Sequence, residues 1–207
     1  MSTTKEWAES LKVETDAELR PVPNFTKLYA RTAQQVAIRA VILQGITAVA
    51  YEVQVRPITE WFQSQEIWCG VTPKEREFLF SSVRTESERV QFQWQQEAQW
   101  TLLWMIGKVE SLGLPTQYCD TRRLVDEIIP ALGSDLHGFI GQSELRSPGA
   151  LLAEDERTYN LWRYALAAQR NGESLPSDLN LGVLRERRYA FEWMDGNQDW
   201  DEVTCDA

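Results

Sequence analysis

The stretch FQWQQEAQWTLLWMIGKVESL, residues 92–112, decides the fold class of this chain. Its mostly apolar residues recur at three- and four-residue spacing along two adjacent stripes, one with Phe92, Trp100, Leu103 and the polar Gln96, the other with Trp94, Ala98, Leu102 and Met105. A face this broad is typical of a helix that packs on several sides. We therefore predict a central helix over residues 85–111, ended by Gly113 and Pro115.

Helical patterns also occupy most of the remaining chain. We expect further helices over residues 24–54, with Asn24 as N-cap, and over 58–68, 72–82, 121–132, 149–170 and 183–194. Thr72, Pro73 and Glu75 form a helix start signal, and Asn171-Gly172 forms a stop signal. No segment alternates convincingly at strand period. The predicted fold is all-α, an irregular multi-helix bundle, with residues 24–207 as one domain and 1–23 as an N-terminal appendage that we expect to be helical.

Composition restricts the partners and the compartment. The net charge is −10, which argues against nucleic acid and anionic membranes as partners and favours a basic protein. The apolar run 37–53 contains Arg39 and is too short to span a bilayer, so a buried helix is the better interpretation. The three cysteines, Cys69, Cys119 and Cys205, are far apart in the sequence, and their odd number argues against a disulfide framework, so we expect reduced thiols. The N-terminus lacks an apolar signal segment, so we expect the protein in the cytoplasm.

The C-terminal tail DGNQDWDE, residues 195–202, invites comparison with a calcium loop. Asp195, Asn197 and Asp199 match the first, third and fifth positions, but Trp200 stands where a glycine is needed, and Asp206 where a glutamate is usual. We therefore predict no metal site here. One histidine and three scattered cysteines make no zinc site either.

A structural clasp is the preferred interpretation of the same tail. We expect Arg187 or Arg188, on the last helix, to pair with a carboxylate and so fix the path of the chain beyond that helix. Trp193 and Trp200 should then be largely buried on either side of the turn.

Two acidic groups are the candidate partner-binding residues: Asp199, Asp201 and Glu202 in the tail, and, as second choice, Glu154, Asp155 and Glu156 near a helix start. Both groups have plainer explanations, because acidic residues complement a helix N-terminus and acidic tails are usually solvated. We assign no catalytic residue and no cofactor, since Cys119 and His137 would have to meet by chance and no phosphate loop is present.

One family resemblance covers roughly residues 31–206. It rests on RTAQQVAIRAVILQGI, ITEWF, TPKEREFL, FQWQQEAQWTLLWMIGKVESLGLPTQYCD, VLRERRYAFEWM and DWDEV in this order. These segments resemble the bacterial family numbered 4272 among the domains of unknown function. Gln95 stands where that family commonly has arginine, which marks a divergent member. The resemblance implies a helical fold and a bacterial origin, and no activity.

Three functions stay open at this point. The first is a non-enzymatic protein-binding protein, most concretely a cytoplasmic immunity protein that neutralises a toxin with acidic and aromatic groups. The second is an enzyme in which folding brings Glu97, Glu154 and Asp199 into one cleft. The third is a structural or adaptor subunit, which includes a homodimer. We favour binding.

Overall fold

The computed structural model describes residues 30–175, 178–196 and 198–205. Within these ranges the chain forms helices and no strand, so the predicted all-α fold is correct. The appendage expected over residues 1–23 and the expected N-cap Asn24 lie outside the described residues.

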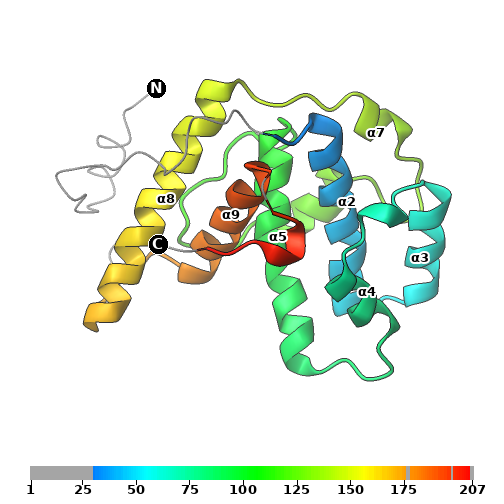
Figure 1. Ribbon diagram of the computed structural model, residues 1–207, viewed down its shortest axis with the longest axis horizontal. Helices are drawn as coiled ribbons and strands as arrows, with labels where there is room; N and C mark the ends of the chain where they lie inside the picture. Colours follow the sequence, from blue (N-terminus) through cyan, green and yellow to red (C-terminus); the bar gives the residue numbers. More distant parts are fainter. Residues whose placement is uncertain (1–29, 176–177, 197, 206–207) are drawn as a thin grey trace.

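Helix α5 (Glu86–Met105) stands at the centre of the fold (Figure 1). It packs against α2 (Ala33–Ala50) on one side and α9 (Leu181–Met194) on the other, and α9 in turn packs against α8 (Pro148–Asn171). The C-terminal half of α5 is buried around its circumference, as the two apolar stripes predicted. This helix therefore connects the two halves of the structure.

Helix α2 begins at a capping box in which Thr32 and Gln35 each satisfy a backbone N–H of the other. The helix is long and apolar enough to cross a membrane by length and composition, and 72% of that stretch is buried inside the protein. Its Arg39 is buried as well and pairs with Glu75 of α4 (Pro73–Phe80). The segment thus serves as a core helix in this fold, as expected from its sequence.

Gly45 lets α3 (Val55–Ser64) approach α2 closely. A methyl group at this position would lie 2.4 Å from the Phe62 ring and 2.8 Å from Ile58. Pro57 falls in the first turn of α3, where no intrahelical donor is needed, so this helix starts before the proline rather than after it. A 3₁₀ turn, η1 (Trp68–Gly70), leads to α4, whose predicted start at Thr72 is confirmed by a complete capping box.

The prediction that the central helix continues to Ser111 is wrong. Helix α5 ends at Met105 because Gly107 adopts a left-handed conformation with φ of 73°, and the N–H of Lys108 turns back to the carbonyl of Leu103. The following chain forms α6 (Thr121–Arg123), one π turn, η2 (Leu124–Ile128), and α7 (His137–Gly141).

The last two helices carry a small apolar cluster of their own, made by Leu161, Trp162, Ala165, Leu179 and Leu184. Helix α8 ends at Gly172 in the left-handed conformation, as predicted. Helix α9 begins at Leu181, two residues earlier than expected, because the Asn180 side chain accepts hydrogen bonds from the N–H groups of Gly182 and Val183. A final 3₁₀ turn, η4 (Trp200–Glu202), follows α9.

Candidate functional site

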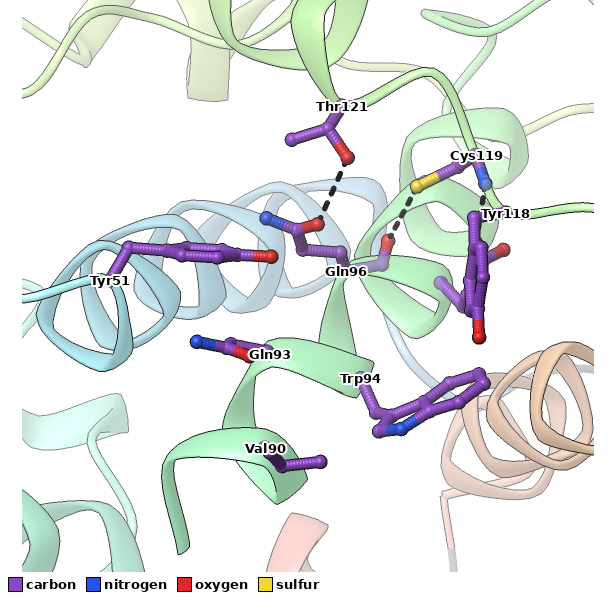
Figure 2. A pocket seen from close by; sticks show the side chains of 9 residues that line it. Tyr51, Val90, Gln93, Trp94, Gln96, Tyr118, Cys119 and Thr121 are labelled. Carbon is purple, nitrogen blue, oxygen red and sulfur yellow. Dashed lines mark hydrogen bonds between the residues drawn. The ribbon is translucent and has the colours of Figure 1, made fainter. Parts of the chain in front are cut away.

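A pocket of about 330 Å³ opens beside the N-terminal half of α5. We call it the Trp94 pocket. Tyr51, which follows α2, forms one side (Figure 2). Another side is formed by Tyr118 and Cys119, which precede α6, and by Thr121, its first residue. The pocket therefore joins three segments that are far apart in the sequence.

Aromatic side chains make up much of its wall. The ring centroids of Trp94 and Tyr118 lie 5.0 Å apart, with an angle of 57° between the ring planes, and the two side chains lie next to each other in Figure 2. Tyr51 projects from the opposite side. Tyr51 is 54% exposed and Tyr118 61% exposed, so both tyrosines are available to a partner.

A buried carboxylate also lines this pocket. Glu97 is 2% exposed, and its Oε1 accepts a hydrogen bond from the backbone N–H of Cys119. Its Oε2 is buried without a hydrogen-bond partner. Burial raises the pKa of Glu97, whereas the Cys119 N–H and the charge of Arg187 lower it. Glu97 thus contributes to the pocket wall a carboxylate with one oxygen that is enclosed by the protein and unpaired.

The Cys119 thiol is a poor nucleophile in this setting. Burial and the neighbouring Glu97 raise its pKa well above the ordinary value, so the thiol stays protonated. Its sulfur lies 3.7 Å from the carbonyl oxygen of Gln96. His137, on α7, is exposed and is not among the residues that line this pocket.

Polar side chains hold the pocket together. Gln93 donates to the carbonyl of Ala50 at 3.2 Å, which fixes the end of α2 against α5. Gln96 accepts a hydrogen bond from the Thr121 hydroxyl at 3.1 Å, drawn in Figure 2. These contacts position the tyrosine-bearing segments relative to α5.

The C-terminal tail lies at a different pocket, of about 390 Å³, which we call the tail pocket. Trp193 and Trp200 are buried there as expected, with ring centroids 5.4 Å apart. Arg31 stacks on Trp193 at 4.8 Å, and Arg39 stacks on Trp200 at 5.0 Å. The Tyr189 hydroxyl donates to the carbonyl of Trp200. The tail is thereby fastened to α2 and α9.

The two arginines considered for the clasp, Arg187 and Arg188, have their partners outside the tail. Arg188 pairs with Asp155 of α8 and with Glu192 of its own helix. Arg187 donates instead to the carbonyls of Leu112 and Gly113. A carboxylate contact for one of these arginines is confirmed, but that contact links α9 to α8 rather than directing the tail.

The acidic residues proposed for partner binding differ in how far their side chains are buried. Asp155 is fully buried, so its place in an exposed partner-binding group needs correction. Burial raises its pKa to about 7, although Arg188 lowers it. Glu154 and Glu156 are partly exposed, and Glu154 pairs with Arg157 at 3.2 Å.

In the tail, Asp199 and Glu202 are exposed, whereas Asp201 accepts a hydrogen bond from the N–H of Lys74 at 2.9 Å. The structure does not bring Glu97 and Asp199 together, because Glu97 lines the Trp94 pocket and Asp199 the tail pocket. The central residue of the rejected calcium loop, Asn197, lies outside the described residues.

Sequence patterns missed the tyrosines of the Trp94 pocket. Tyr51 lies at the end of a buried helix, and Tyr118 lies in a segment without periodicity. The spacing places Trp94 on the broad apolar face of α5, and nothing in the sequence indicates that its side chain is partly exposed. Of the residues that line this pocket, Glu97 and Cys119 were considered for chemistry.

The described residues define a class: an all-α protein with an aromatic pocket that includes a buried carboxylate. The family model described as "Domain of unknown function (DUF4272)" matches residues 1–203. The chain therefore belongs to the DUF4272 family. No curated protein and no solved structure matches it.

Proposed function

We propose that the protein is a non-enzymatic protein-binding protein, most concretely a cytoplasmic immunity protein that neutralises a cognate bacterial toxin. One observation carries the proposal: two exposed tyrosines border a pocket that contains a buried carboxylate. Tyrosine and tryptophan supply large rigid contact areas and are enriched at interaction hot spots.

The exposed surface at this pocket is partly apolar. Val90 lines it together with Tyr51 and Tyr118, and Val53, also exposed, lies two residues beyond Tyr51. Contiguous exposed apolar groups on a folded surface often mark an interaction site. A partner that covered these side chains would remove them from water.

Charge favours a basic partner. The chain carries 31 acidic against 21 basic residues, and opposite charge accelerates encounter between proteins. A toxin with a cationic cleft, such as a nuclease, fits this requirement.

The acidic tail is better suited to the rim of such an interface than to its centre. Trp200 is buried and cannot act as an exposed anchor. Asp199 and Glu202 are exposed and available for steering a basic partner, whereas Asp201 already caps the start of α4.

The test is direct binding to the product of the adjacent gene, measured by calorimetry at low and high salt. The proposal predicts a stable complex whose affinity falls as salt rises, and inhibition of the partner's toxic activity. Absence of binding at both salt concentrations would contradict it. Light scattering of the protein alone supplies a second check, because a homodimer that covers Tyr118 would favour the structural-subunit alternative.

A further inference from the structure

We propose that the Trp94 pocket is the receptor for one arginine side chain of the partner, with its guanidinium on Glu97 and between the rings of Tyr51, Trp94 and Tyr118. This inference rests on the proposed function and specifies the chemistry of its interface.

The first argument is the unsatisfied oxygen of Glu97. A buried acceptor without a partner is costly, and a ligand that donates to it removes that cost. Glu97 Oε1 is occupied by the Cys119 N–H, which leaves Oε2 as the unpaired acceptor. Because Oε2 has almost no exposed surface, the guanidinium reaches it only when the carboxylate turns toward the pocket. A charged donor suits a carboxylate best, because charge-assisted hydrogen bonds are about twice as strong as neutral ones.

The second argument concerns the nearest cation of the protein itself. Arg187 is buried close enough to influence Glu97, but its guanidinium donates to the carbonyls of Leu112 and Gly113. It leaves Oε2 of Glu97 without a hydrogen bond. A second carboxylate, Glu154, also acts on Arg187 electrostatically, so Arg187 faces more than one negative charge.

The third argument is the aromatic wall. Arginine stacks on aromatic faces and is more weakly hydrated than lysine, so it enters such a pocket at a lower desolvation cost. This protein already pairs arginine with aromatic rings elsewhere, as Arg31 with Trp193 and Arg146 with Trp104. Rings that are still exposed around Glu97 offer the same contact to an outside arginine.

The test uses the full chain and two small probes whose termini are uncharged. They are Nα-acetyl-arginine amide and its neutral isostere, Nα-acetyl-citrulline amide. Trp fluorescence and calorimetry follow the binding of each. We expect the arginine probe to bind at millimolar concentration, at least about 10-fold more tightly than the citrulline probe, since one charged hydrogen bond is lost in the latter.

Variants locate the site. Glu97→Gln should weaken the arginine probe about 10-fold, and Tyr118→Ala several-fold. Their matched controls are Glu60→Gln, which changes an exposed glutamate on α3, and Phe80→Ala, which removes an exposed ring at the end of α4. Neither control should alter binding. Tyr118→Ala keeps the test valid if Glu97→Gln fails to fold, because Tyr118 is largely exposed.

Two results would overturn the inference: equal binding of both probes, or no binding of the arginine probe at millimolar concentration. If the toxin still bound in either case, the proposed function would stand and only the pocket chemistry would fail. If the probe bound and the adjacent gene product did not, the immunity function would fail and the cation site would stand.

Discussion

The carboxylate of Glu97 on α5 accepts a hydrogen bond from the backbone N–H of Cys119, 22 residues further along the chain. This contact holds the segment that carries Tyr118 against the central helix. It also leaves one carboxylate oxygen buried and unpaired in the Trp94 pocket. Glu97 therefore holds the Tyr118 segment in place and also supplies the carboxylate of the proposed arginine site.

Gly182 is predicted to control the shape of the Trp94 pocket. An added Cβ would lie 2.3 Å from the Trp94 ring, so Gly182→Ala must displace that ring. We expect a loss of about 1–3 kcal/mol in the free energy of unfolding and weaker probe binding. Gly149→Ala is the control, because a Cβ there meets nothing within 4 Å. Equal behaviour of the two variants in urea unfolding and probe titration would contradict the expected packing.

Removal of Asp155 should destabilise the contact between α8 and α9. Asp155 and Arg188 form an ion pair with side-chain exposures of 0% and 2%. Asp155→Ala leaves the buried guanidinium with Glu192 as its carboxylate partner, so we expect a loss of about 3 kcal/mol in urea unfolding. Glu60→Ala, which breaks an exposed pair with Arg56, should cost less than about 1 kcal/mol. A similar loss in both variants would argue against a structural role for the buried pair.

Stability should fall as the pH rises from about 5 to 7. Burial raises the pKa of Glu186 to about 7, opposed by Arg185 and assisted by Glu97. In this range the folded chain keeps a proton that the unfolded chain releases. The free energy of unfolding therefore decreases, by at most about 1.4 kcal/mol per pH unit for this group.

The pH dependence can be assigned with Glu186→Gln, which removes the titrating group and should flatten the curve. Asp155 and Asp195 contribute in the same direction, because burial raises their pKa values to about 7 and about 6. Urea unfolding at several pH values measures the slope. Parallel curves for wild type and Glu186→Gln would exclude Glu186 as a source.

Trp200 is predicted to fasten the tail. Its ring is buried between Trp193, Tyr189 and the guanidinium of Arg39. Trp200→Ala should therefore cost about 3–5 kcal/mol in the free energy of unfolding. Glu202→Gln, on the same turn but exposed, should leave stability nearly unchanged. A loss for Trp200→Ala no greater than for Glu202→Gln would show that the tail is not a structural clasp.

The fold class and several helix starts could be predicted because their signals are local. Thr72 and Glu75 cap α4 from within the helix itself, and Gly172 ends α8 by its own conformation. The end of α5 was misplaced because Gly107 is followed by further apolar residues, Val109 and Leu112, which are buried without being helical. Apolar spacing reports burial and only indirectly the backbone conformation.

The candidate site could not be assembled from sequence patterns. Tyr51, Glu97 and Tyr118 meet only through tertiary packing, with Tyr118 held by a backbone contact at the adjacent Cys119. Asp155 and Glu154 are adjacent in sequence, yet Asp155 is fully buried and Glu154 is not, because the helix turns one side chain toward Arg188. Charge patterns alone do not separate such neighbours.

The most direct test of the central claim follows the tryptophan indole N–H signals of the labelled protein while the adjacent gene product is added. Substitution of single tryptophans assigns the signals. Binding at the Trp94 pocket predicts that the Trp94 signal shifts or broadens, while the signals of Trp193 and Trp200 at the tail pocket stay in place. A complex that shifted the tail signals and left Trp94 unchanged would contradict the account.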